Sequence, residues 1–102
     1  MTNGETALFK IGIHPSGVMA KRVVGFIDFW TSSDLEFDAA FLRYCRKNEI
    51  ELKTLIVDII AIKQKAISNN EMLQHLFKPM TYVEFITVLA HIGVNQGAAT
   101  LS

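Results

Sequence analysis

Three histidines, one cysteine and a set of carboxylates are the side chains of this sequence that could perform acid–base, nucleophilic or metal chemistry. His14, His75 and His91 lie far apart, and none has a second histidine or a cysteine at the spacing of a metal-binding pair. A structural zinc ion needs four convergent ligands, usually supplied in closely spaced pairs. We therefore expect no metal site, and we interpret His75 and His91 as partly buried or capping residues.

The cysteine and the carboxylates also have simpler explanations than catalysis. Cys45 follows Tyr44 within a predicted helix, where apolar neighbours raise the pKa of a thiol and make it a poor nucleophile. Asp34, Glu36 and Asp38 could act as an acid–base pair, but carboxylates in the first turn of a helix usually serve the helix dipole. The glycines are scattered and form no phosphate-binding loop. We expect no enzymatic activity, no cofactor and no small-molecule substrate.

Bulk composition excludes further classes of function. The chain has 102 residues, half of them apolar, and equal numbers of acidic and basic residues. A single domain of this size leaves apolar surface uncovered, which favours self-association or a protein partner, whereas zero net charge provides no global attraction for nucleic acid. The apolar run Leu55–Ile62 is interrupted by Asp58 and is too short to span a bilayer. One cysteine and no signal peptide predict a cytoplasmic protein.

The N-terminal part of the sequence predicts a flexible end and then a strand. Residues 1–6 are polar, and Ala7–Ile13 alternates apolar and polar positions with the period of a strand. No second run alternates in this way, so the segment either pairs with its copy in a dimer or is not a strand. With the turn at Pro15 and the helix after it, the order resembles that of ribbon-helix-helix proteins, which implies dimerisation.

Amphipathic helices are predicted over most of the remaining chain. Apolar residues recur every three or four positions over Val18–Trp30. Ser33 and Glu36 form an S-x-x-E capping box, which predicts a second helix that runs to Lys47 and ends at Asn48.

The next two helices are predicted from a wide apolar stripe and from capping residues. Ile50–Ile67 carries a stripe wide enough for a central helix that is covered on two sides, although its β-branched residues leave a strand as the alternative. Three capping residues, Ser68–Asn70, precede a short helix over Glu71–Phe77 that Pro79 ends.

The C-terminal segment carries a second capping box and a glycine that could end its helix. The pattern consists of Thr81, Tyr82, Glu84, Phe85, Leu89, Gly93 and Val94. It resembles the first helix and turn of helix-turn-helix DNA-binding regulators from bacteria and phages. The resemblance implies a turn at Gly93 and a second helix that faces DNA. The implied base or phosphate contacts are Lys78, Asn95, Gln96 and Thr100, with Arg43, Arg46 and Lys47 as phosphate clamps.

Taken together, the sequence predicts an all-α domain over residues 7–102, a compact array of four to five helices with or without one N-terminal strand paired across a dimer. The predicted function is that of a small non-enzymatic regulatory or adaptor protein that self-associates, as a homodimer, and binds a protein partner. Phe26, Phe29 and Trp30 are the predicted contact residues, because aromatic side chains are frequent at binding hot spots. The alternative is a helix-turn-helix DNA-binding regulator of bacterial or phage origin.

Overall fold

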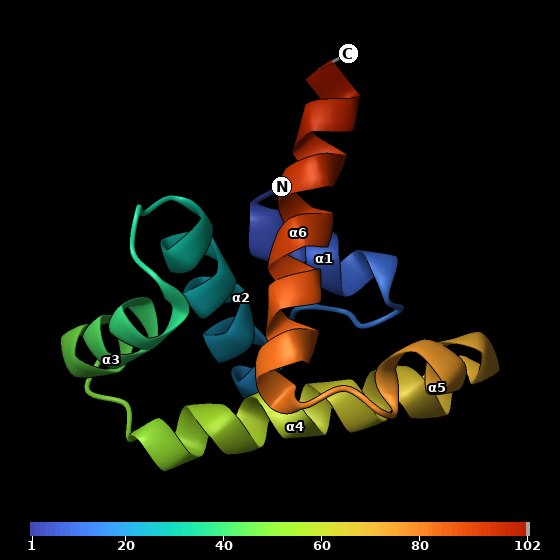
Figure 1. The fold of residues 1–102 in the computed structure, drawn as a ribbon, viewed down its shortest axis with the longest axis horizontal. Coiled ribbons are helices and arrows are strands. Elements are labelled where there is room, and N and C mark those ends of the chain that lie inside the picture. The colour runs from blue at the N-terminus through green and yellow to red at the C-terminus, as the bar shows by residue number, and fades with distance from the viewer. Residues whose placement is uncertain (102) are drawn as a thin grey trace.

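The computed structural model describes the backbone of residues 1–101 and the side chains of residues 1–94. Over these residues the chain is all-α and contains no strand. The predicted fold class is therefore confirmed, whereas the predicted number of helices and the N-terminal strand are wrong. The helices, shown in Figure 1, are α1 (Asn3–Lys10), α2 (Val18–Thr31), α3 (Phe37–Lys47), α4 (Leu52–Asn69), α5 (Glu71–Phe77) and α6 (Tyr82–Leu101).

Helix α1 occupies most of the segment that the alternating pattern assigned to a strand. Its start is fixed by a capping box: the Thr2 hydroxyl accepts a hydrogen bond from the Glu5 N–H, and the Glu5 carboxylate accepts one from the Thr2 N–H. Residues 3–6, assigned to the flexible end, lie in its first turn. The buried side chains Ala7, Leu8 and Ile11 follow helical spacing, so a dimer paired through this strand is also wrong.

The boundary between α2 and α3 differs from the predicted one because Ser33 is used by the preceding helix. Its hydroxyl donates to the carbonyl oxygen of Trp30 at 3.0 Å and so closes the end of α2. Helix α3 begins at Phe37, and its N-cap Glu36 makes no capping hydrogen bond through its side chain, so the predicted Ser33–Glu36 box is not formed. The C-cap at Asn48 is confirmed, and the Asn48 side-chain amide donates to the carbonyl oxygen of Tyr44.

The second half of the chain follows its capping residues closely. Asn70 caps α5 through its side chain, and the predicted Thr81–Glu84 capping box is present at the start of α6. Helix α6 then continues through Gly93 to Leu101 without a turn. The predicted helix-turn-helix arrangement is therefore wrong in the described part of the chain.

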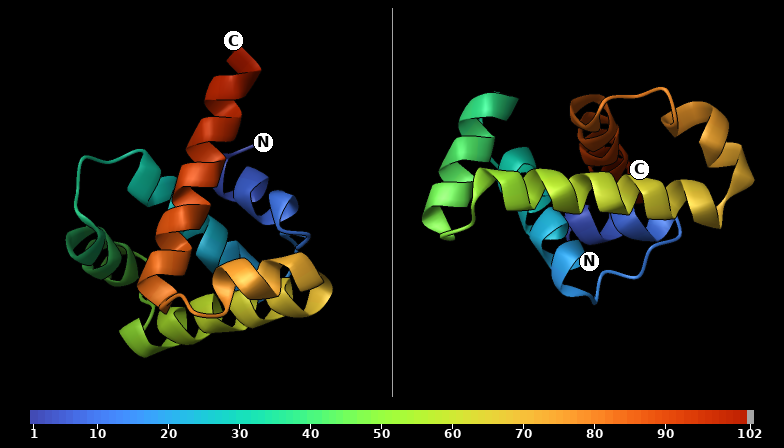
Figure 2. Two further views of the ribbon diagram at one scale, coloured as in Figure 1. Left: turned by 45° about the vertical axis from the view of Figure 1, so that its right-hand side comes forward. Right: turned by 90° about the horizontal axis from the view of Figure 1, so that it is seen from below.

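The helices pack around a common core. In Figures 1 and 2, α4 crosses beneath α2 and α6, with α3 near its N-terminal end and α5 at its C-terminal end. Helix α1 packs against both α2 and α6, and α4 contacts α2, α3, α5 and α6. The largest fully buried side chains come from α1, α2, α4, α6 and the loop before α2, and include Leu8, Ile13, Phe26, Leu55 and Phe85.

Two glycines allow α1 to lie unusually close to its neighbours. A Cβ atom on Gly4 would come within 2.5 Å of the carbonyl oxygen of Val24 in α2. A Cβ atom on Gly93 of α6 would come within 2.3 Å of the carbonyl oxygen of Asn3. Gly93 is therefore required by a contact between helices, and this contact explains a glycine that the sequence pattern assigned to a helix end.

The capping carboxylate of α6 should make stability depend on pH. Hydrogen bonds from Thr81, its backbone N–H foremost, lower the pKa of Glu84 from its ordinary value of 4.5. A carboxylate whose pKa is lowered by folding adds stability above its unfolded pKa, and this stability is lost as the pH falls through the folded pKa. We expect Glu84→Gln to lower Tm most above about pH 5 and progressively less below about pH 4. Thermal denaturation followed by circular dichroism would measure this, and a pH-independent difference would contradict it.

Candidate protein-binding face

One flank of α4 is apolar and exposed, although the opposite flank forms part of the core. Leu55, Ile59 and Ile62 are buried at helical spacing. The exposed apolar side chains of this flank are Leu52, Val57 and Ile60 of α4, with relative exposures of 43%, 51% and 38%. Leu42 of the adjoining α3 is 50% exposed. We call these four residues, with the half-buried Ile56 and Tyr82, the α4 face. Part of the apolar stripe predicted to be covered therefore remains exposed.

Two adjoining hollows give the α4 face its shape. The first, of about 330 Å³, lies between α3, α4 and the start of α6, and its lining includes Leu42, Leu52 and Ile56. The second, of about 530 Å³, lies between α4, α5 and the start of α6, and its lining includes Ile60 and Ile67. Both are lined by Tyr82, so together they follow α4 from Leu52 to Ile67, a distance of about 22 Å at the α-helical rise.

The two ends of this surface carry opposite charges. Among residues 1–94, Asp38 is the only charged residue that lines the first hollow, whereas Lys63 and Lys78 line the second, where these residues contribute no carboxylate. The Lys63 ammonium donates to the carbonyl oxygens of Met80 and Lys78 and thereby holds the turn between α5 and α6. The Lys78 side chain is exposed. Of the charged side chains that line the two hollows, the acidic one thus lies at one end of the α4 face and the basic ones lie at the other.

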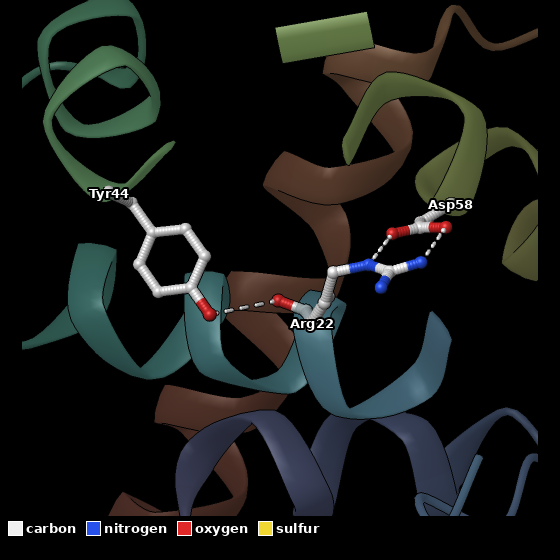
Figure 3. A network of polar contacts seen from close by, with 3 residues as sticks. All are labelled: Arg22, Tyr44 and Asp58. Carbon is white, nitrogen blue, oxygen red and sulfur yellow. Dashed lines mark hydrogen bonds and ion pairs between the residues drawn. The ribbon is translucent and has the colours of Figure 1, made fainter. Parts of the chain in front are cut away.

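A buried ion pair lies beneath the opposite flank of α4 and was not predicted. Figure 3 shows the Arg22 guanidinium of α2 donating to both carboxylate oxygens of Asp58, at 2.5 and 3.2 Å. The side chain of Asp58 is 3% exposed and that of Arg22 is 30% exposed. The hydrogen bond to Asp58 raises the pKa of Arg22. A sequence signal was available, because Asp58 is flanked by buried positions of α4 and a charge there needs a partner.

The same network extends to α3 through Tyr44. Its hydroxyl donates to the carbonyl oxygen of Arg22 at 3.4 Å, which links α3 to α2 beside the ion pair (Figure 3). Burial, more than the nearby Cys45 and Asp28, raises the pKa of the Tyr44 hydroxyl. All three side chains have partners and join helices, so the arrangement explains how α2, α3 and α4 are held together.

The three aromatic residues predicted as protein contacts have different environments. Phe26 is fully buried and contacts the rings of Trp30, Phe37, Phe41 and Tyr44. Phe29 is half-buried, between the Tyr44 ring and the ammonium of Lys47, which lies 6.0 Å from its ring centroid. Trp30 is half-buried and lines a hollow of about 270 Å³ against α6. Phe26 therefore belongs to the core, whereas Phe29 and Trp30 remain predicted contacts.

Within residues 1–94, the residues predicted to contact DNA are not brought together by the fold. Arg43, Arg46 and Lys47 are exposed on α3, near one end of α4. Lys78 follows α5, which packs along the other end of α4 (Figure 1). The side chains of Asn95, Gln96 and Thr100 lie outside the described residues, so the structure gives no position for those predicted contacts.

The other candidate groups identified in the sequence are dispersed as well. Cys45 is buried, and burial raises the pKa of its thiol, as predicted from its apolar neighbours. His14, His75 and His91 are exposed, so of the two roles predicted for His75 and His91 partial burial is not found, and the capping role stays a prediction. No group of three or more histidine, cysteine or acidic side chains that could hold a metal ion occurs within residues 1–94.

The three carboxylates considered as an acid–base pair do not share one helical turn. Asp34 and Glu36 precede the first turn of α3, which they were predicted to share with Asp38.

Comparison of the chain with protein-family models, with curated proteins and with solved structures found no match in any of the three. Among the helices in the described part of the chain, none has the length and the apolar composition needed to cross a membrane.

Proposed function

We propose that this protein is a small non-enzymatic regulatory or adaptor protein, which acts by self-association and by binding a protein partner through the α4 face. The observation that supports the proposal is the apolar flank formed by Leu52, Ile56 and Ile60, which are exposed or half-buried at a spacing of four residues on α4, with the exposed Val57 beside Ile60. Isolated apolar side chains are normal on a protein surface, but contiguous patches beside a hollow are typical of interaction sites.

Binding at the α4 face would be favourable because it removes exposed apolar side chains from water. Removing apolar surface from water contributes about 25 cal/mol per Å², and the exposed parts of several aliphatic side chains would be covered together. The charged ends beyond this apolar centre resemble the polar rim that surrounds the apolar part of many interfaces. We place the protein in the cytoplasm, because its single, buried cysteine forms no disulfide within the chain.

The DNA-binding alternative is not proposed further. It depended on a helix pair at the C-terminal end, and α6 is one continuous helix over the described residues. Its predicted phosphate contacts on α3 and at Lys78 also lie at different ends of α4.

Site-specific photo-crosslinking tests the proposed function. A photoreactive amino acid in place of Val57 should form covalent adducts with protein in the cells that naturally produce this chain, either with a second copy or with another protein. The same group in place of Met19 of α2 is the matched control, because this apolar side chain is similarly exposed, at 45% against 51% for Val57, and lies outside the α4 face. Adducts should be strong at position 57 and weak at position 19. Equal yields at the two positions, or no adduct at position 57, would count against the proposal.

A further inference from the structure

The α4 face is suited to pairing with a second copy of itself. Leu52, Val57 and Ile60 are its exposed apolar side chains on α4, and Leu52 and Ile60 line the two hollows that meet at Tyr82. When two copies are related by a two-fold axis that passes through the centre of such a surface, the apolar side chains of one copy meet those of the other. A two-fold interface uses one surface twice, so a face whose apolar side chains extend to both sides of its centre meets this requirement.

The charges of the face match the same symmetry. A two-fold axis near Tyr82, the residue shared by the two hollows, runs the two α4 helices antiparallel and brings the first hollow of one copy to the second hollow of the other. Asp38 of one copy then lies opposite Lys78 of its partner, and the pair occurs twice. Glu84 is exposed at the basic end, but its carboxylate accepts a hydrogen bond from the Thr81 N–H in the α6 cap, and Glu84 lines neither hollow.

We infer that the occupant of the α4 face is a second copy of this chain, bound antiparallel about a two-fold axis near Tyr82, with Asp38 of each copy facing Lys78 of the other. The inference rests on the proposed function and names its partner. It replaces the predicted strand-paired dimer with a helix-paired one. The apolar centre supplies the association energy, and the two charged pairs select the antiparallel orientation.

A charge-swap experiment tests the orientation as well as the dimer. Asp38→Lys alone places like charges at both pairs of its homodimer, and so does Lys78→Asp alone. Each variant should therefore dimerise about tenfold more weakly than the wild type, measured by analytical ultracentrifugation at low salt. An equimolar mixture of the two variants should dimerise again, because every introduced lysine then faces an introduced aspartate and the other pair keeps its natural charges.

Further variants separate the specific interface from general effects of charge. Lys21→Asp reverses an exposed charge on α2 outside both hollows and should leave dimerisation unchanged. Val57→Lys should abolish dimerisation, whereas Met19→Lys should not. Circular dichroism spectra like that of the wild type would show that each variant is folded.

The outcomes also distinguish this inference from the proposed function. A wild-type chain that stays monomeric over the micromolar range would overturn the second-copy inference, and so would a mixture of the two charge variants that dimerises no better than either alone. A photo-adduct at position 57 with a different protein would in that case still support the proposed function. Failure of the crosslinking experiment together with a monomeric chain would overturn both.

Discussion

Replacing Gly93 by alanine is expected to lower the free energy of unfolding by about 3 kcal/mol, measured by urea denaturation. The added Cβ atom would lie 2.3 Å from the carbonyl oxygen of Asn3 and 2.9 Å from its carbonyl carbon. These are backbone atoms of α1, so α1 itself must move. Its movement is opposed by the hydrogen bonds from the Gly4 N–H to Asp28 and from the Asn3 amide to Thr31, at 2.7 and 3.1 Å.

Two comparisons identify the cause of this loss. In an exposed helix, glycine to alanine stabilises by about 1 kcal/mol, so the expected sign is opposite to that of helix propensity. Gly25→Ala should cost less than Gly93→Ala, because its nearest contact, at 2.2 Å, is the hydroxyl at the tip of the Tyr44 side chain and not a backbone atom. Thr87→Ala, at an exposed position of α6, is the control and should change stability by less than about 0.5 kcal/mol. A Gly93→Ala variant as stable as the wild type would contradict the close packing of α1 on α6.

Removal of Arg22 is expected to have a similarly large effect. Arg22→Ala leaves the Asp58 carboxylate, with its side chain 3% exposed, without the guanidinium that accounts for both of its hydrogen bonds. Breaking a buried ion pair in this way costs about 3–5 kcal/mol, and we expect about 3 because Arg22 is 30% exposed and its charge is partly solvated. Urea denaturation at neutral pH would measure the loss.

The double variant Arg22→Met with Asp58→Leu separates the cost of an unpaired charge from the value of the pair. Both replacements are apolar, so no buried charge is left alone, and the double variant should recover most of the stability lost in Arg22→Ala. Lys21→Ala removes the neighbouring, exposed charge and should change stability by less than about 0.5 kcal/mol. A loss in Arg22→Ala no larger than in Lys21→Ala would show that the pair has no structural role.

Helix boundaries could be predicted where local capping chemistry determined them. Asn48, Asn70 and the Thr81–Glu84 pair act on residues within four positions of themselves, so the sequence alone contains the required information. The same reasoning applied to Thr2 and Glu5 would have predicted α1, but the alternating pattern after them favoured a strand. Ser33 shows the limit of such reasoning. Its hydroxyl could cap the start of α3 or the end of α2, and in the structure it donates to the Trp30 carbonyl oxygen at the end of α2.

Features that depend on distant segments could not be predicted in this way. The need for glycine at position 93 arises from Asn3, at the other end of the described chain. The wide stripe of α4 predicted a largely buried helix, but which flank stays exposed depends on where α3, α5 and α6 pack. The aromatic contact residues were chosen by type alone, so Phe26, which packs among four other rings, could not be separated from Phe29 and Trp30.

The packing of α1 against α6 has a consequence for biosynthesis. During translation α1 leaves the ribosome before α2 and can pack on it soon afterwards, but α6, the helix that covers its other side, is made only after α2 to α5. Contacts between segments so far apart in sequence form slowly, because a long loop must close first. The nascent chain therefore holds α1 half-packed until α6 emerges, and the native packing of α1 is completed only after α2 to α5 have been synthesised.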